Sequence, residues 1–406
     1  MKTIFDDYEF SYQLWRAMGA SAYGGADIGE CLSTASRIKA GDFESWHREW
    51  LSTAEKVHAV ADKALSEGHL VSAREAYLRA SSYYRTAEFF LHSDPKDPRI
   101  LLTWRKSRIC FRRALGSLPH PAYMVNISYE NTTLPGYFFK PDNSSKPRPT
   151  VILNTGFDGT AEELYFSQGQ AAIQRGYNCL AFEGPGQGSV IREQGIPFRP
   201  DWEKVVTPVI SYLRSRSDVD PAKIALMGLS MGGYLAPRAA AYDKRIAACI
   251  ANGGVYYLDF TRGTAMTRDA MDALYDHPDR FDERTRAEME TDTSMKRSIE
   301  HGMYVFGVKT PHEFMLRSRD YTLEECADLI ECPTLVVDSE NEHAFRGQAR
   351  MLYDALKCQK EFMLFTDEEG AGEHCQAGAS RLSNQRIFDW LDGQFARQHK
   401  SERLDL

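Results

Sequence analysis

The sequence lacks a surplus of basic residues and lacks any long apolar run, and each absence excludes a class of protein. Its 406 residues include 49 lysines and arginines against 57 aspartates and glutamates, a formal net charge of −8. Proteins that bind DNA or RNA usually present a basic surface to the phosphates, so we expect no nucleic acid partner. A membrane-spanning helix needs about 20 predominantly apolar residues, and no run approaches that length. We therefore expect no membrane partner.

Paired cysteines and metal-binding motifs are missing as well. The 8 cysteines include no C-x-x-C pair, and several, such as Cys179 and Cys249, lie in apolar segments. This pattern indicates buried free thiols in a reducing compartment. The first residues lack the apolar stretch of a secretory signal peptide, so we expect a cytoplasmic location. Since neither a His-Glu-x-x-His motif nor a nucleotide-binding fingerprint occurs, we expect no metal and no other cofactor.

Strand and helix patterns alternate in the part of the chain after residue 118. Apolar runs predict buried strands at 150–153, 177–182, 224–227, 247–251, 334–337 and 361–365. Helical patterns lie between or after them at 162–175, 201–217, 233–242, 346–356 and 375–398. This alternation predicts an α/β fold, in which helices cover both faces of a mostly parallel sheet.

Further helical patterns precede and interrupt this core. Residues 1–118 carry apolar side chains at helical spacing, and Gly68 separates two helices of an expected αα-hairpin. About 65 polar and helical residues separate two of the later strands, which is more than a crossover connection needs. We expect a helical N-terminal cap domain at 1–118, a core formed by 119–261 and 326–406, and a helical lid insertion at 262–325. A surface decoration is the alternative interpretation of the insertion.

One pentapeptide indicates chemistry. Ser230 is the centre of Gly228-Leu229-Ser230-Met231-Gly232, which follows a predicted strand and precedes a predicted helix. A G-x-S-x-G motif in this context is the nucleophile elbow of the α/β-hydrolase fold. The serine occupies a sharp, strained turn that leaves little room for side chains on its neighbours. We expect Ser230 to attack an acyl or carbonyl carbon.

A nucleophilic serine needs a base, which in this fold follows it in the chain after an acidic residue. His301 and His312 fall in the helical insertion, and His399 falls in a polar tail. His374 lies in the loop just beyond the predicted strand 361–365, where the catalytic histidine of this fold belongs. We predict that His374 is the base.

The acidic residue should follow the strand 334–337. Asp338, Glu340 and Glu342 are the candidates. The acid usually comes about four residues past the end of this strand, a position that Glu342 occupies. Its role would be to hold the histidine in the productive tautomer. We predict Glu342, with Asp338 as the alternative and with His343 as a bystander.

Two backbone N–H groups should stabilise the oxyanion. One belongs to Met231, the residue after the nucleophile. The other belongs to the loop that follows the first buried strand, Asn154-Thr155-Gly156-Phe157-Asp158-Gly159, in which Phe157 is the expected donor. A tight turn without a ligand is the alternative for this loop.

With these residues, the chain resembles the α/β-hydrolase group that contains the fungal heptaketide hydrolases of pigment biosynthesis and the bacterial 2,6-dihydroxypseudooxynicotine hydrolase. The resemblance covers nearly the whole chain and rests on Trp46, Trp50, the segment 79–85, Gly156-Phe157-Asp158-Gly159-Thr160, Glu183-Gly184-Pro185-Gly186-Gln187-Gly188, Gly228-Leu229-Ser230-Met231-Gly232-Gly233, Glu369-Gly370-Ala371, His374-Cys375 and Phe388-Asp389-Trp390-Leu391. The nucleophile and the base of the group match Ser230 and His374. Its acid is usually Asp, where this chain has Glu342.

The resemblance implies hydrolysis of a carbon–carbon bond beside a ketone in a small polyketide-like or aromatic substrate. The group also contains carboxylesterases and enzymes that tailor or cyclise polyketides and polyketide–peptides, and both remain alternatives. A non-catalytic binding protein on the same fold is the alternative of another class. Asp158, Tyr84 and Arg85 are candidate substrate contacts, with ordinary packing and loop capping as the other interpretation. Many hydrolases with such caps are homodimers, which is the association expected here.

Overall fold

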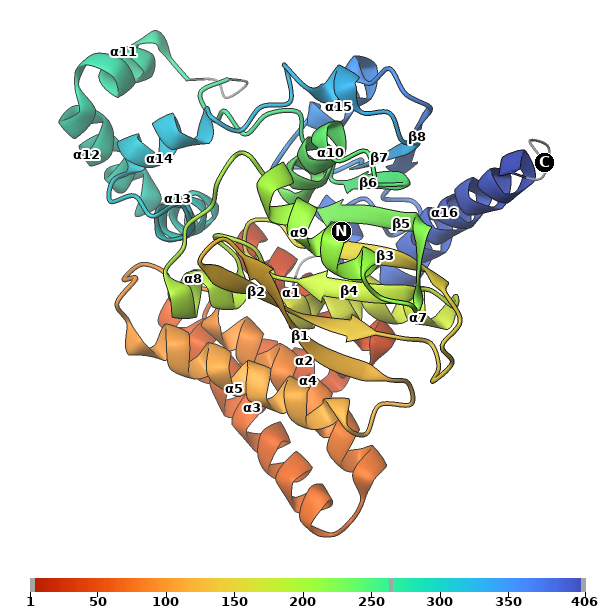
Figure 1. Cartoon of the computed structure of the whole chain (residues 1–406). Helices are drawn as coiled ribbons and strands as arrows, with labels where there is room; N and C mark the ends of the chain where they lie inside the picture. The colour runs from red at the N-terminus through yellow and green to blue at the C-terminus, as the bar shows by residue number, and fades with distance from the viewer. Residues whose placement is uncertain (1–3, 263–265, 403–406) are drawn as a thin grey trace. The chain divides into compact units, whose positions relative to one another are not determined.

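The computed structural model describes residues 4–262 and 266–402, which divide into two compact units (Figure 1). Unit 1 is drawn from Met1–Leu118, Pro185–Pro200 and Tyr257–Thr322. Unit 2 is drawn from Pro119–Gly184, Asp201–Tyr256 and Leu323–Leu406. The residues predicted to carry out the chemistry all belong to unit 2.

Unit 2 is built on one eight-stranded sheet with the order β1-β2-β4-β3-β5-β6-β7-β8. The strands are β1 Ala122–Tyr129, β2 Thr132–Phe139, β3 Arg148–Asn154, β4 Asn178–Phe182, β5 Val219–Leu229, β6 Ala248–Asn252, β7 Thr334–Ser339 and β8 Lys360–Phe365. The hairpin β1–β2 is antiparallel and β2 pairs antiparallel with β4, whereas all pairs from β4 to β8 are parallel. Parallel pairing brings the carboxyl ends of these strands to one edge of the sheet, where loops can gather functional groups.

Burial explains why the sequence forms these strands. Val151, Ile152 and Leu153 are completely buried in β3, and all of β4 and β6 is buried. Continuous apolar runs are typical of parallel strands that are covered on both faces. The edge strand β1, by contrast, alternates buried and exposed residues along most of its length. The structure confirms the predicted α/β fold with a mostly parallel sheet.

Helices flank this sheet (Figure 1). They are α6 Ala161–Leu164, α7 Gln170–Gln174, α9 Glu203–Arg214, α10 Gly232–Tyr242, α15 Gln348–Ala355 and α16 Ser380–Glu402. Helix α10 packs on β5, β6 and α9, whereas α7 packs on β4 and α16. Helix α10 begins at Gly232, just after β5 ends at Leu229, so Ser230 lies in the turn between them.

Two of these helices differ from the sequence prediction. The pattern at 162–175 forms α6 and α7 separated by a π-helical turn, Tyr165–Gly169. The pattern at 375–398 does not begin as an α-helix, because Cys375 and Gln376 have positive φ angles. A short 3-10 turn at His374–Gln376 replaces it, and α16 starts at Ser380. His374, the predicted base, thus lies in a tight turn.

Unit 1 is helical. Its helices are α1 Tyr8–Gly19, α2 Ile28–Ala35, α3 Phe43–Ser66, α4 Leu70–Glu88, α5 Pro98–Leu115, α8 Gly188–Gln194, α11 Arg268–Asp276, α12 Pro278–Met289, α13 Thr293–Phe306 and α14 Pro311–Ser318. Helices α3 and α4 form the predicted αα-hairpin, and α5 packs on α4 (Figure 1). Trp46, Trp50 and Tyr83 are completely buried between the helices of this unit. Buried apolar residues on α3, such as Trp46 and Trp50, favour the packing of this helix in unit 1.

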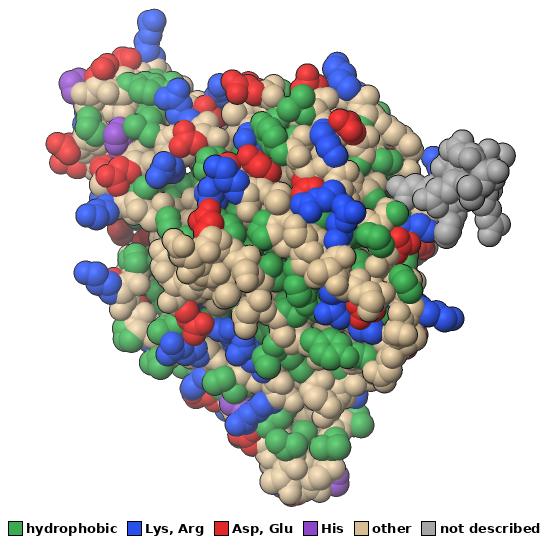
Figure 2. Space-filling model, viewed as in Figure 1, with side chains coloured by type: hydrophobic (Ala, Val, Ile, Leu, Met, Phe, Trp, Pro, Cys, Tyr) green, Lys and Arg blue, Asp and Glu red, His purple; other side chains and the backbone are tan. Residues whose placement is uncertain are grey.

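The surface carries both signs of charge. Figure 2 shows lysine and arginine side chains interspersed with aspartate and glutamate over the visible face. Among the residues that the structure describes, no helix is long and apolar enough to cross a membrane.

Candidate active site

Ser230 lies in the turn between β5 and α10, in a strained backbone conformation. Its φ angle is +58°, which a residue with a side chain rarely adopts. Gly228 makes the tight approach possible, because a Cβ atom there would lie 1.8 Å from the carbonyl oxygen of Gly232. The backbone N–H of Ser230 donates to the carbonyl oxygen of Asn252, at the end of β6, at 2.8 Å. This is the geometry of a nucleophile elbow.

His374 lies close to the predicted nucleophile, Ser230, from the turn that follows β8. Its Nε2 atom lies 2.8 Å from the Oγ atom of Ser230. The side chain is 6% exposed, so the contact is largely shielded from water. An unprotonated Nε2 at this distance can accept the proton of the serine hydroxyl.

Glu342 holds the opposite nitrogen of the imidazole. One of its carboxylate oxygens lies 2.5 Å from Nδ1 of His374. The other oxygen accepts hydrogen bonds from the backbone N–H groups of Ala344 at 2.8 Å and of Phe345 at 3.0 Å. The carboxylate is therefore fixed on both sides, and it keeps the proton of a neutral His374 on Nδ1 and leaves Nε2 free to act as an acceptor.

Asp338, the alternative acid, lies within β7 and bonds locally. Its carboxylate accepts the backbone N–H of Ser339 at 2.9 Å. Burial raises the pKa of Asp338, and the nearby Glu342 carboxylate raises it further. The structure thus brings Glu342 rather than Asp338 to the Nδ1 atom of His374.

Burial and charge act in opposite directions on the buried pair. Burial disfavours the charged form of Glu342, but His374 outweighs burial and holds the pKa of Glu342 at about 2. Burial also favours neutral His374, but the adjoining Cys375 and Glu342 side chains outweigh it and raise the pKa of His374 above its ordinary value. The pair would therefore stabilise the imidazolium formed if His374 takes up a proton.

The loop after β3 lies against the elbow. A Cβ atom on Gly156 would lie 2.7 Å from the backbone nitrogen of Met231, so only glycine permits this approach. Phe157 follows Gly156 in the same loop, and Met231 directly precedes α10. The two segments predicted to supply oxyanion donors are thus in contact. The N-terminus of α10 adds a favourable dipole for negative charge.

The three candidate substrate contacts lie in different units. Asp158 belongs to the loop after β3 in unit 2, and Tyr84 and Arg85 lie on α4 in unit 1. The Tyr84 hydroxyl lies 3.1 Å from Nδ1 of His58, and the side chain is 1% exposed. The guanidinium of Arg85 lies 4.9 Å from the ring centroid of Phe89. Both α4 residues therefore have packing roles within unit 1.

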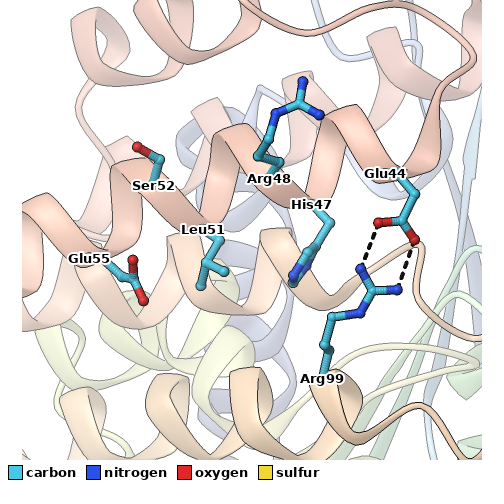
Figure 3. Close-up of a pocket in the computed structure, with 7 residues that line it drawn as sticks. All are labelled: Glu44, His47, Arg48, Leu51, Ser52, Glu55 and Arg99. Atoms are coloured by element: carbon cyan, nitrogen blue, oxygen red, sulfur yellow. Dashed lines mark hydrogen bonds and ion pairs between the residues drawn. The ribbon is translucent and has the colours of Figure 1, made fainter.

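A surface groove of about 450 Å³ lies along α3 of unit 1 (Figure 3). Two of its charged groups neutralise each other, because Arg99 binds the Glu44 carboxylate with two nitrogens at 2.6 and 2.8 Å. This contact lowers the pKa of Glu44. Nδ1 of His47 lies at hydrogen-bond distance, 2.9 Å, from the carbonyl oxygen of Ala87. The groove holds none of the predicted catalytic residues.

Across residues 4–262 and 266–402, no group of three or more His, Cys, Asp or Glu side chains is arranged to hold a metal ion.

Three polar residues beside the predicted triad were not among the sequence predictions. Asn252 ends β6, Ser339 ends β7, and Gln376 follows the predicted base by two positions. Their side chains form a buried hydrogen-bonded chain. The sequence gives no signal for this chain, because the contacts join segments that lie far apart along it.

The fold and the geometry of the site indicate an α/β-hydrolase, and comparison with known proteins supports this class. The chain belongs to the alpha/beta hydrolase family, which it matches over residues 151–375. The protein is therefore an enzyme of the hydrolase class.

Relatives match over almost the whole chain. Hydrolase LUC6 from a Fusarium species is 35% identical, over 97% of this chain and 98% of its own length. The 20-hydroxy-prefusarin hydrolase FUS2 from Gibberella moniliformis is 33% identical, over 98% of this chain and 99% of its own length. Among solved structures, the 2,6-dihydroxy-pseudo-oxynicotine hydrolase is similar in fold, with a TM-score of 0.73, 22% identity, and coverage of 92% of this chain and 94% of that chain. These matches confirm the resemblance noted from the sequence.

Proposed function

We propose that this enzyme is a serine hydrolase that cleaves a carbon–carbon bond next to a ketone, or an acyl bond, in a small polyketide-like or aromatic ketone substrate. Ser230 is the nucleophile, His374 the general base and Glu342 the acid of the triad. The observation that carries the proposal is the distance of 2.8 Å between Oγ of Ser230 and Nε2 of His374. The similarity to FUS2, a 20-hydroxy-prefusarin hydrolase, supports a small organic substrate.

The chemistry follows from the positions of the side chains. Oγ of Ser230 attacks a ketone carbonyl while His374 accepts its proton. The resulting oxyanion is stabilised by the backbone N–H groups of Met231 and Phe157. The carbon–carbon bond then breaks, and its electron pair leaves as an enolate, which takes the proton from His374. The products of this step are an acyl-enzyme and a shortened ketone.

Water completes the cycle. His374 takes a proton from water, and the hydroxide attacks the acyl-enzyme. Collapse of the second oxyanion returns the proton to Ser230 and releases a carboxylic acid. The balance is one β-diketone and one water consumed, and one acid and one ketone formed. With an ester, an alcohol replaces the ketone as leaving group, so a carboxylesterase needs no other catalytic residue.

Two assays test this proposal. A fluorophosphonate should label the wild-type protein at Ser230 and should not label Ser230→Ala, whereas an unlabelled wild type would favour a non-catalytic binding protein. Purified enzyme should then be offered a β-diketone and a p-nitrophenyl ester, with products followed by mass spectrometry. Rapid ester turnover without diketone cleavage would instead support the carboxylesterase.

The cap role of residues 1–118, the lid role of 262–325 and the homodimer stay predictions. So do the substrate contacts of Asp158, Tyr84 and Arg85. If Arg85 binds substrate, Arg85→Gln should raise KM while kcat changes little.

A further inference from the structure

The two residues that follow His374 adopt a backbone conformation that costs free energy. Cys375 has a φ angle of +51° and Gln376 has one of +54°. Residues with a Cβ atom rarely enter this left-handed region, and they remain there only where other contacts hold them. The turn that carries the proposed base therefore depends on contacts made by its neighbours.

The side chain of Gln376 makes such contacts at both ends of its amide group. Its Nε2 donates to the Oγ atom of Ser339 at 3.0 Å, and its Oε1 accepts from Nδ2 of Asn252 at 3.0 Å. The side chain is 1% exposed, so water does not compete for these bonds. Since Ser339 ends β7 and Asn252 ends the neighbouring β6, one amide links the turn to two strands.

The same two strand ends hold the other two members of the triad. The carbonyl oxygen of Asn252 accepts the backbone N–H of Ser230 at 2.8 Å. The carbonyl oxygen of Ser339 accepts the backbone N–H of Glu342 at 3.0 Å. Asn252 and Ser339 thus contact the nucleophile and the acid through their backbones, and contact Gln376 through their side chains. Movement of Gln376 relative to them would change how far His374 lies from Ser230.

We propose that Gln376 is a positioning residue, which fixes the His374 imidazole against Ser230 by its bonds to Asn252 and Ser339. An amide suits this role because it offers a donor and an acceptor at once. The proposal rests on the triad proposed above, since it assigns Gln376 a role only through His374.

Matched substitutions test the role. Gln376→Met keeps the length of the side chain but removes both hydrogen bonds. Gln376→Glu keeps an acceptor for Asn252 and can accept from the Ser339 hydroxyl. The control is Gln394→Met. Gln394 lies on α16, is also a buried glutamine (4% exposed) and accepts a hydrogen bond from Nε2 of Gln359 at 3.0 Å.

The measurements are the rate of labelling of Ser230 by a fluorophosphonate, together with kcat and KM. Because misplacing a catalytic group by about 1 Å can cost about 100-fold, Gln376→Met should lower the labelling rate and kcat by about that factor with little change in KM. Gln376→Glu should recover most of the loss, and Gln394→Met should label at the wild-type rate.

Thermal unfolding of each variant separates positioning from folding. A folded Gln376→Met that labels as fast as wild type would overturn the proposal, as would an equal loss in Gln394→Met. Should Gln376→Met not fold, Ser339→Ala takes its place, since it removes one of the two bonds; slower labelling supports the role, and wild-type labelling overturns it. Wild-type protein that resists labelling altogether would instead reject the triad itself.

Discussion

Nδ1 of His374 lies 2.5 Å from a carboxylate oxygen of Glu342, in a site where both side chains are almost completely buried. The carboxylate comes from the turn after β7 and the imidazole from the turn after β8. Their contact sets the tautomer and the charge of the imidazole that faces Ser230.

Removing the charge of Glu342 should disable the enzyme. Glu342→Gln keeps the size of the side chain but can present a donor to Nδ1, so His374 loses its orientation and tautomer. By analogy with other serine triads, kcat should fall by about 10⁴-fold. Asp338→Asn is the matched control, because Asp338 bonds to the N–H of Ser339 at 2.9 Å, and it should retain most of the wild-type kcat. The larger loss in Asp338→Asn would assign the acid to Asp338.

The pH dependence of kcat/KM should report the raised pKa of His374. Only neutral His374 can accept the serine proton, so activity rises as pH increases through this pKa. Because the pKa lies above the ordinary 6.5, the midpoint of the acid limb should also lie above 6.5. In Glu342→Gln the carboxylate that raises the pKa is gone, so the residual activity should have its midpoint at lower pH. An unchanged midpoint would contradict the assigned coupling.

Gly228 should tolerate no side chain. In Gly228→Ala, the new Cβ would overlap the carbonyl oxygen of Gly232, which is backbone and cannot rotate away. Overpacking of this kind typically costs about 1–3 kcal/mol of the free energy of unfolding, and the elbow would also be displaced. Chemical denaturation and fluorophosphonate labelling should both show the damage.

Gly393→Ala provides the control for that experiment. Gly393 lies in α16, and a Cβ atom there would meet nothing within 4 Å. Alanine in a helix interior is more favourable than glycine by roughly 0.5–1 kcal/mol, so this variant should be slightly more stable than wild type. Equal loss of stability in both variants would show that the contact at Gly228 is not the cause.

A buried histidine pair should make unit 1 sensitive to acid. Nε2 of His92 lies 2.8 Å from the Glu88 carboxylate, and Nδ1 of His92 lies 2.9 Å from Nδ1 of His301. Burial lowers the pKa of His92; Glu88 opposes this, and the positive charges of Arg192 and Arg297 lower the pKa further. His92 is therefore neutral in the folded protein at a pH where the unfolded chain binds a proton.

Proton binding by the unfolded chain sets how stability changes with pH. Below the unfolded pKa of about 6.5, the unfolded state binds more protons at this position, so stability falls as pH falls, by up to about 1.4 kcal/mol per pH unit. His92→Gln cannot take up this proton, so its unfolding free energy should fall less between pH 7 and 5. Urea denaturation at several pH values measures both slopes. Parallel slopes in the two proteins would contradict the prediction.

Local sequence patterns predict much of the candidate site. The elbow around Ser230 was predictable because strand, glycine-bordered serine and helix are consecutive in the chain. Strand order in this fold predicts His374 in the loop after one strand and the acid, Glu342 or Asp338, after another. Helical periodicity does not predict the π-helical turn at Tyr165–Gly169 or the left-handed turn after His374. Tertiary contacts override the local pattern at both places.

The sequence by itself therefore determined the α/β fold, the hydrolase class and three candidate residues, since these depend on apolar periodicity and on motif order. Only the tertiary structure decided that Glu342, rather than Asp338, reaches His374, and that Gln376 joins the ends of β6 and β7. The physical reason is that both outcomes depend on distances of a few ångström between segments that are remote in the chain. No local preference encodes such distances; the packing of the parallel strands sets them.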